Sequence, residues 1–169
     1  MIAILDAAYG DTASAVACVT VDDWGNASAL AEFTHRAGPA ADYEPGEFYK
    51  RELPLLLSVL GMLPRAPEII VIDGYVWLGV EDRKGLGAHL FEALGSASGV
   101  VGIAKTKFHG ASYWAAEVRR GSSDSPLYVT SAGVDAGEAA VAVKRMHGEH
   151  RIPTLVTLAD RLAREALQA

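Results

Sequence analysis

Glu68-Ile69-Ile70-Val71-Ile72-Asp73-Gly74 is the stretch of sequence around which the rest of the chain can be placed. Its four consecutive β-branched residues predict a strand buried on both faces, which is typical of a central strand in a parallel or mixed sheet. Asp73 stands at the carboxyl end of this strand, at the edge where open α/β sheets place their chemistry. Asp73 is therefore a candidate site acid. The alternative is that Asp73-Gly74 only turns the chain, because Asp-Gly is a common turn pair.

Length and composition bound the class of protein. A chain of 169 residues, half of them hydrophobic, predicts a single domain spanning residues 1–169 with one core. The formal net charge of −6 argues against a surface that coats nucleic acid in general, but it leaves room for a local basic groove. Cys18 is the only cysteine, which predicts a packed thiol in a reducing compartment. No basic leader and no apolar run of roughly 20 residues is present, so we expect a soluble cytoplasmic protein.

A second acid follows the first predicted strand in the same way. Ile2-Ala3-Ile4-Leu5 is a short apolar run, and Asp6 ends it. Two further strands are predicted at residues 15–21 and 27–34. The segment between them contains Gly and Asn, which suit a hairpin loop, so Asp22 and Asp23 are interpreted as turn residues and not as ligands.

A third acid lies on the apolar stripe of a predicted helix that runs to about Met62. Helical spacing places Glu52 among the stripe residues Phe48, Leu55, Leu56 and Val59. An ionised carboxylate that faces a core needs a cation, a hydrogen-bond donor or a metal. An ion pair with Arg or Lys remains the alternative to a metal. Pro54 predicts a kink or a tighter first turn, because it has no N–H to donate.

Two lysines and a histidine follow the central strand. A helix is predicted at residues 86–94, and His89 on it is either a functional donor or an ordinary helix histidine. A further buried strand at residues 100–104 leads into Lys105 and Lys107, which strand alternation places on one face. Two cations at the end of a strand suit a phosphate, although a solvated strand end has the same appearance.

The last third of the chain supplies the fourth acid. A hairpin is predicted from residues 116–119 and 127–130, followed by a helix for which Asp135 is the N-cap and not a site acid. The terminal helix, residues 154–169, carries Asp160 in a row with Val156, Ala163 and Leu167. Either the site or Arg164, four residues later, would provide the partner that this acid needs.

Four acids therefore stand out by position: Asp6, Glu52, Asp73 and Asp160. Carboxylates without Cys or His spacing favour hard divalent cations such as Mg²⁺ or Mn²⁺. The order of elements along the chain is that of a ribonuclease-H-like α/β fold: a strand acid, two antiparallel strands, a helix and then a second strand acid. Such an arrangement serves two-metal hydrolysis of phosphodiesters.

Short motifs also occur in one order along nearly the whole chain. They are Tyr43-Glu44-Pro45-Gly46, Arg51-Glu52, Ile72-Asp73-Gly74, Gly85-Leu86-Gly87-Ala88-His89, Gly102-Ile103-Ala104-Lys105, Pro126-Leu127-Tyr128-Val129, Arg151-Ile152-Pro153 and Leu158-Ala159-Asp160. Each motif alone is weak. Their colinear succession resembles endonuclease V, the inosine-directed nuclease family of DNA repair and RNA turnover.

The resemblance implies a metal-dependent endonuclease with Mg²⁺ as cofactor, Mn²⁺ as substitute, and inosine-containing DNA or RNA as partner. It implies a metal site formed by Asp6, Glu52, Asp73 and Asp160, with Lys105 holding a phosphate close to the reaction. The expected substrate contacts are a base-flipping wedge from Tyr43 and Pro45, base-pocket backbone groups from Gly46 and Gly74, and the side chains of His89 and Lys107.

The sequence also departs from the family pattern. Where the family has Asp-Gly-x-Gly and then His-Pro-Arg, this chain has Tyr75-Val76-Trp77 and Glu81-Asp82-Arg83. This altered loop borders the expected base pocket. The alternative function is a catalytically silent nucleic-acid-binding relative of the same fold. An actin-like kinase would share strand-end acids but requires a longer chain and glycine-rich phosphate loops.

Overall fold

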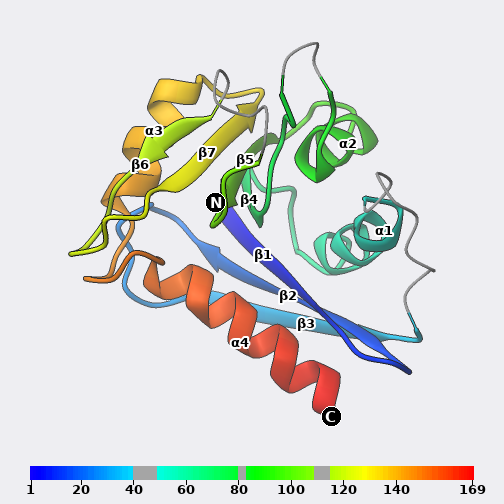
Figure 1. Cartoon of the computed structure of the whole chain (residues 1–169). Coiled ribbons are helices and arrows are strands. Elements are labelled where there is room, and N and C mark those ends of the chain that lie inside the picture. The colour runs from blue at the N-terminus through cyan, green and yellow to red at the C-terminus, as the bar shows by residue number, and fades with distance from the viewer. Residues whose placement is uncertain (40–48, 80–82, 109–114) are drawn as a thin grey trace.

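A computed structural model describes residues 1–39, 49–79, 83–108 and 115–169. The strands are β1 Ile2–Tyr9, β2 Ser14–Val21, β3 Ala31–Ala37, β4 Ile69–Asp73, β5 Gly99–Ala104, β6 Ala116–Val118 and β7 Leu127–Ala132. The helices are α1 Tyr49–Leu60, α2 Leu86–Ala93, α3 Ala136–Arg145 and α4 Thr154–Gln168. Three strands open the described part of the chain, strands and helices alternate from α1 to β5, and two helices close it (Figure 1).

The strands form one mixed sheet in the order β3-β2-β1-β4-β5-β7-β6. Its centre is parallel, because β1 pairs with β4 and β4 pairs with β5 in the same direction, whereas the remaining pairings are antiparallel. β4 is the predicted central strand, and Ile70 and Val71 on it are almost completely buried. The predicted ribonuclease-H-like α/β fold is confirmed.

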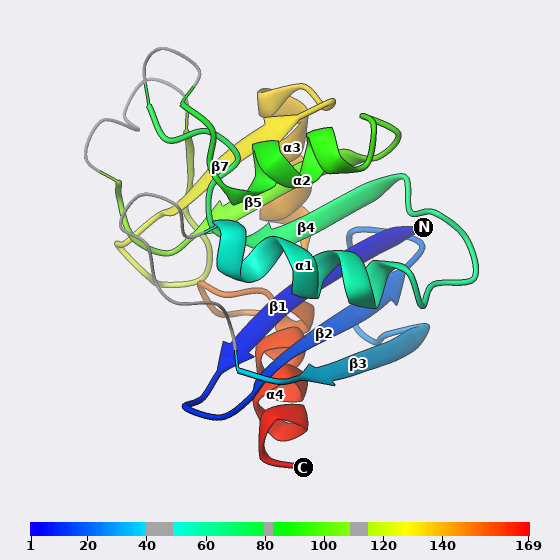
Figure 2. The same ribbon diagram turned by 90° about the vertical axis from the view of Figure 1, so that its right-hand side faces the viewer.

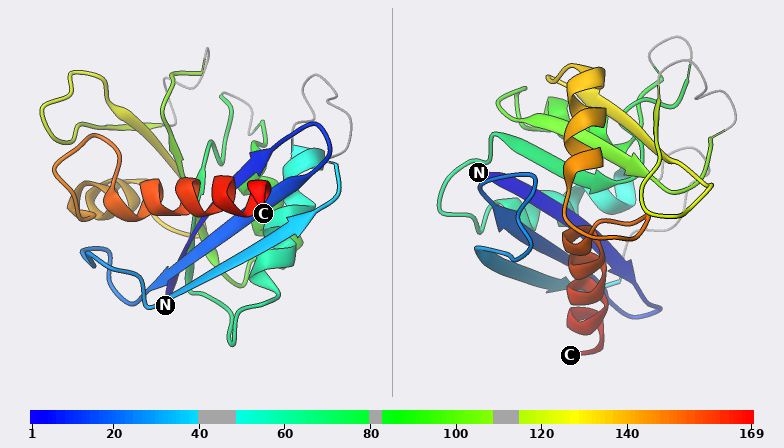
Figure 3. Two further views of the ribbon diagram at one scale, coloured as in Figure 1. Left: turned by 90° about the horizontal axis from the view of Figure 1, so that it is seen from below. Right: turned by 90° about the vertical axis from the view of Figure 1, so that its left-hand side faces the viewer.

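Alternation along β1 divides the core between the two faces of the sheet. Ile2 and Ile4 belong to the cluster that includes side chains of α3 and α4, whereas Ala3 and Leu5 belong to the cluster under α1 and α2. Figure 2 views the face that α1 and α2 cover, and the right panel of Figure 3 shows α3 and α4 on the opposite face. The sheet is thus buried on both sides, which is why β4 reads as a continuous apolar run.

The third strand begins later than predicted, at Ala31 instead of residue 27. Its pairing with β2 starts at Thr20↔Ala31, and the chain before it forms a longer connection. Trp24 and Ala29 of this connection pack against the α3 and α4 core, which takes the chain out of the sheet. Asp23 has the predicted turn role, because its Oδ1 accepts a hydrogen bond of 2.8 Å from the Gly25 amide.

Other local predictions have clear outcomes. Cys18 is fully buried, as predicted, and burial raises the pKa of its thiol to about 12. Asp135 caps α3 as predicted, since its Oδ1 accepts from the amides of Gly137 and Glu138 at 2.9 and 3.0 Å. Pro54 lies inside α1, which is α-helical on both sides of it. In the described residues, no helix combines the length and apolar character needed to cross a membrane.

Candidate active site

Asp73 ends β4, but the prediction that Asp6 ends the first strand is wrong. β1 continues to Tyr9, because it stays paired with β2 as far as Tyr9↔Ser14. The register pairs Ile4 with Val71 and Leu5 with Ile72, so the next step places Asp6 beside Asp73. Ile4 and Val71 point to the face of α3 and α4, and side chains two residues further on point the same way. The two acids are therefore brought together, as the sequence predicts, at the point where the parallel pairing of β1 with β4 stops.

Asp6 is a buried acid with one unsatisfied oxygen. Its side chain is 7% exposed; Oδ1 accepts a hydrogen bond of 2.8 Å from the Ala7 amide, and Oδ2 is buried with no partner among the described residues. Burial, followed by the charge of Asp73, raises the pKa of Asp6 to about 7, although Lys105 acts in the opposite direction. An additional cation would remove both the electrostatic cost and the orphaned oxygen.

Glu52 lies in the first turn of α1 and is 8% exposed. Burial, and then the charges of Asp6 and Asp73, raise the pKa of Glu52 to about 8. Arg51 lowers this pKa through its charge, but its guanidinium carbon lies 4.3 Å from the centre of the Tyr9 ring. The predicted burial of Glu52 is confirmed, and its carboxylate is repelled by the charges of Asp6 and Asp73.

Two cations contact the remaining pair of acids. The Nζ of Lys105 lies 2.5 Å from Oδ2 of Asp73, and Nη2 of Arg164 lies 2.9 Å from Oδ1 of Asp160. Burial by itself would lower the pKa of Lys105, but the hydrogen bond and charge of Asp73, with smaller effects from other acids, raise it overall. The partner that the sequence offered for Asp160 is thus present. Asp160 lies on α4, which packs against β1, and its charge makes a small contribution to the raised pKa of Asp6.

The donor atoms suit a divalent cation, although their present positions are not those of a closed metal shell. Among the described residues, no group of three or more His, Cys, Asp or Glu side chains is arranged to hold a metal ion. Lys105 and Arg164 contact Asp73 and Asp160 in this arrangement. The unsatisfied Oδ2 of Asp6 fits a hard cation, as do the carboxylate oxygens of this set.

The other predicted substrate contacts lie in different surroundings. Gly74 has φ of +128°, which side-chain-bearing residues rarely adopt, and its amide donates to the Ile103 carbonyl at 3.0 Å. His89 stacks on Tyr49 with ring centres 3.5 Å apart, and burial followed by the charge of Lys84 lowers its pKa. The predictions for Tyr43, Pro45 and Gly46 fall outside the described residues.

Lys107 and Lys105 contact different acids. The Nζ of Lys107 lies 3.8 Å from Glu117 of β6, whereas Lys105 contacts Asp73 at the carboxyl end of β4. The structure therefore does not bring both ammonium groups to the same carboxylate.

Tyr75-Val76-Trp77, the start of the altered loop, packs inward against β5 and β7, whereas Glu81 and Asp82 lie outside the described residues. Tyr75 is 9% exposed and Val76 is fully buried. The Tyr75 hydroxyl donates to the Thr106 carbonyl, and the Trp77 indole N–H donates to the Ser131 carbonyl, both at 2.9 Å. The departure from the family pattern therefore contributes core contacts in this chain.

Tyr9 and Arg51 are site neighbours that the sequence analysis did not single out as functional. The Tyr9 hydroxyl and the Arg51 Nε are buried, and the described residues supply no hydrogen-bond partner for either. Burial and then the charge of Glu52 raise the pKa of Tyr9. The signal for Arg51 was its place beside Glu52, whereas Tyr9 carried no signal beyond lying three residues after Asp6.

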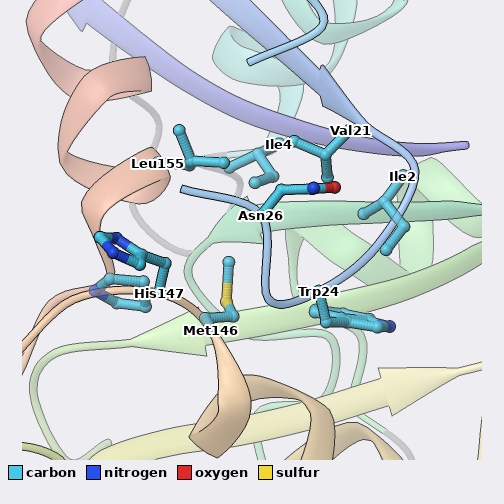
Figure 4. A pocket seen from close by; sticks show the side chains of 9 residues that line it. Ile2, Ile4, Val21, Trp24, Asn26, Met146, His147 and Leu155 are labelled. Carbon is cyan, nitrogen blue, oxygen red and sulfur yellow. The ribbon is translucent and has the colours of Figure 1, made fainter. Parts of the chain in front are cut away.

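A hollow on the α3 and α4 side has a different character (Figure 4). Its lining contains no carboxylate and consists of Ile2, Ile4, Val21, Trp24, Asn26, Met146, His147, Pro153 and Leu155. The lining leaves no room for a water molecule. Among the described residues this hollow is a packed seam of the core.

Comparison with known proteins identifies similar chains. The sequence model of the endonuclease V family matches residues 1–133. Endonuclease V of Streptomyces coelicolor is 30% identical over an alignment of 184 positions that covers 97% of this chain and 78% of that protein.

Solved structures agree over nearly the full chain. The crystal structure of endonuclease V from Streptomyces avermitilis has a TM-score of 0.77 and 29% identity, covering 99% of this chain and 81% of that one. A Ciona intestinalis endonuclease V, crystallised with a DNA that contains an inosine followed by a ribo-adenosine, has a TM-score of 0.79 and 17% identity, covering 99% of this chain and 85% of that one. At this lower identity the likeness concerns the fold.

Proposed function

The chain belongs to the endonuclease V family, a family of nucleases, and on that basis we propose that it is a divalent-metal-dependent endonuclease that cleaves DNA or RNA close to inosine. The observation that carries the proposal is that Asp6 and Asp73 follow the last residue pair of β1 with β4, and that the charges of both acids help to raise the pKa of the buried Glu52. Such a concentration of buried negative charge is costly unless a cation offsets it.

In this proposal Asp6, Glu52, Asp73 and Asp160 hold Mg²⁺, or Mn²⁺ as its substitute. Divalent ions at such a site supply an activated water and stabilise the leaving oxygen of the phosphodiester. Asp6 and Glu52 must lose their protons to act as ligands, because both have pKa values raised to near or above neutrality.

Lys105 binds a phosphate oxygen of the substrate in the proposed reaction. Its ammonium group lies at the edge of the acidic cluster and is 40% exposed, so a phosphate can approach it. When Lys105 leaves Asp73 to bind the phosphate, the Asp73 carboxylate becomes free to bind a metal ion. One movement of Lys105 therefore serves both phosphate binding and metal binding. Arg164 is placed to make the corresponding change at Asp160.

Recognition of the base is proposed to use the segments around the site. Tyr43 and Pro45 would fill the gap left by a flipped-out base, and one stacking contact is worth about 1–3 kcal/mol. Gly46 and Gly74 would offer backbone groups to the base, with His89 and Lys107 as further contacts. We also propose that the chain acts as a single domain and works in the cytoplasm.

A cleavage assay tests the proposal. Matched DNA and RNA strands, with and without one inosine, are incubated with the protein and Mg²⁺ or Mn²⁺. We expect cleavage close to inosine that chelation stops and that Asp73→Asn abolishes. The second candidate, a silent relative, rests on the contact of Lys105 and Arg164 with two of the acids. Binding of inosine strands without cleavage under any metal would favour the silent relative.

A further inference from the structure

The connection between α3 and α4 is built around a buried arginine. Arg120, which follows β6, is 6% exposed, and its guanidinium donates to main-chain carbonyls of this connection. Its acceptors are the carbonyls of Met146, of Gly148 and His150 at 3.1 Å each, and of Arg151 at 3.3 Å. The side chain of Met146, at one end of the connection, lines the packed seam shown in Figure 4. The Arg120 guanidinium therefore holds the connection from inside, and the packing of the Met146 side chain fixes one of its ends.

Arg151 lies in the connection that Arg120 holds, and its side chain joins the ends of two strands. Its Nη2 donates to the carbonyl of Lys105 and, at 2.8 Å, to the carbonyl of Pro126. Lys105 follows β5, and Pro126 precedes β7. The pairing of β5 with β7 stops at Ala104↔Tyr128, so Lys105 and Pro126 lie beyond its last residue pair. There the Arg151 guanidinium joins the two chain segments by hydrogen bonds in place of strand pairing.

The bond to Lys105 bears on the acidic cluster. A lysine side chain has four flexible carbons, so its ammonium group is placed only as well as its backbone is. The ammonium group of Lys105 reaches Asp73 from a backbone whose carbonyl Arg151 holds. Arg151 is half-buried, and its Nε has no hydrogen-bond partner among the residues described. Its guanidinium group therefore acts, among these residues, through its two hydrogen bonds to the carbonyls of Lys105 and Pro126.

We propose that Arg151 is a positioning residue that fixes Lys105 against Asp73, with Arg120 holding Arg151 in place. This inference deepens the proposed function and rests on it, since it assigns Lys105 to the phosphate. Arg151 acts through the main chain of Lys105 and does not itself touch the substrate.

Amine labelling tests the proposal without any cleavage. Wild type and Arg151→Met are treated with a mild acylating reagent, and mass spectrometry gives the labelling rates of Lys105 and Lys107. Lys107 is the internal control, because it lies two residues away and is similarly exposed. We expect the rate at Lys105 to rise about two- to fivefold, the range for losing one partly exposed ion pair, with Lys107 unchanged. An unchanged Lys105, or an equal rise at both lysines, overturns the proposal.

Two further variants keep this test decisive. Arg151→Lys retains a positive charge but has a single donor group, so we expect it to raise the labelling rate of Lys105 by less than Arg151→Met does. This variant provides the test if Arg151→Met does not fold. No rise in Arg151→Lys would then overturn the proposal. Arg161→Met, which removes an exposed arginine that pairs with Glu165 on α4, is the matched control and should leave both labelling rates unchanged.

Kinetics distinguish positioning from a general loss of structure. On inosine strands we expect Arg151→Met to lower kcat about tenfold, Lys105→Met to lower it further, and the double variant to equal Lys105→Met within about twofold. Losses that multiply would show that Arg151 does not act through Lys105, which overturns the proposal. A wild type that cleaves nothing would refute the proposed function, while the labelling experiment would still decide the role of Arg151.

Discussion

The ammonium group of Lys105 lies 2.5 Å from Oδ2 of Asp73, at the carboxyl end of the central strand. Asp73 is the acid that the sequence places most clearly at a site, and its partner here is the same lysine that is proposed to hold phosphate. In the proposed reaction a divalent ion would compete with Lys105 for this carboxylate. Among the residues that the structure describes, the acids lie close together without forming a ready-made metal shell.

The first prediction is that metal stabilises the fold. Asp6 and Glu52 repel each other and Asp73, so an ion that binds them only in the folded state must raise the melting temperature. At a Mg²⁺ or Mn²⁺ concentration ten times its Kd, we expect a rise of about 3–6 °C for a chain of this size. Differential scanning fluorimetry across a metal titration measures it.

Two variants act as controls for this effect. Asp73→Asn should abolish the rise, whereas Asp124→Asn, which changes an exposed acid in the loop between β6 and β7, should preserve it. A melting curve that does not respond to either metal would count heavily against the site.

The second prediction concerns pH. The folded-state pKa of Asp6 is raised from 3.8 to about 7, and that of Glu52 from 4.5 to about 8. The folded protein therefore binds more protons than the unfolded chain between about pH 4 and pH 8, so metal-free stability must fall as pH rises through this window. The slope should approach about 1.4 kcal/mol per pH unit for each proton held. Urea unfolding in chelator at pH 5, 6.5 and 8 measures it.

Glu52→Gln separates the contribution of one acid. The amide cannot ionise, so this variant should be more stable than wild type at pH 8 without metal, and its stability should depend less on pH. The same variant should gain less stability from metal. Equal pH slopes for wild type and Glu52→Gln would show that Glu52 is not the buried acid responsible.

The sequence predicted the parts of the site that depend on local pattern. Strand periodicity located Asp73 at the end of β4, and helical spacing placed Glu52 on a buried stripe. The predicted end of the first strand at Asp6 was wrong, because β1 continues to Tyr9. Side-chain chemistry at a helix start identified the cap at Asp135. In each case the neighbours that decide the outcome lie within a few residues in the sequence.

Contacts between distant segments were not predictable in this way. The pairing of Lys105 with Asp73 joins two strands, and the contact of Arg151 with the Lys105 carbonyl joins residues 46 positions apart. The stacking of Arg51 on Tyr9 depends on how α1 crosses the end of β1. The late start of β3 has a similar cause, because packing of the preceding connection on the core overrode a strand-like pattern.

The third prediction is catalytic. Asp6→Asn and Asp73→Asn should each lower cleavage of inosine strands by several orders of magnitude and leave the fold intact, because both acids are proposed to hold the ions. Asp135→Ala is the control. Loss of its cap bonds to Gly137 and Glu138 should cost about 0.5–2 kcal/mol of stability with cleavage nearly unchanged. Gel-based cleavage rates and urea melts give both quantities, and comparable losses of cleavage at Asp135 and Asp73 would show that the acids are misassigned.

The fourth prediction concerns Tyr43, which lies nine residues before Glu52 in the sequence. If its ring replaces a flipped-out base, Tyr43→Ala should weaken binding to an inosine duplex by about 1–3 kcal/mol. Single-stranded inosine substrate should lose less, because no partner base has to be stacked there. Fluorescence anisotropy with both substrates measures the difference. Equal losses of affinity for the two substrates would mean that Tyr43 stacks on bases in general or has a structural role. They would contradict its role as a base-flipping wedge.

The last prediction decides whether Asp160 is a metal ligand or only one half of an ion pair. Arg164 contacts Asp160 through Nη2 at 2.9 Å and Nε at 3.0 Å, so a metal that uses Asp160 has to displace it. Arg164→Met should therefore tighten Mn²⁺ binding about twofold or more, since the lost pair of this exposed type is worth about 0.3–0.5 kcal/mol and a nearby positive charge is also removed.

Arg161→Met provides the matched comparison, because Arg161 forms the equivalent pair with Glu165 on the same helix at 3.8 Å. Both variants lose one positive charge and one pair between residues four positions apart, but only Arg164 contacts the candidate ligand. Isothermal titration with Mn²⁺ should show tighter binding in Arg164→Met and no change in Arg161→Met. If the two variants bind Mn²⁺ alike, the contact with Arg164 is the structural role of Asp160, and the metal site is left with Asp6, Glu52 and Asp73.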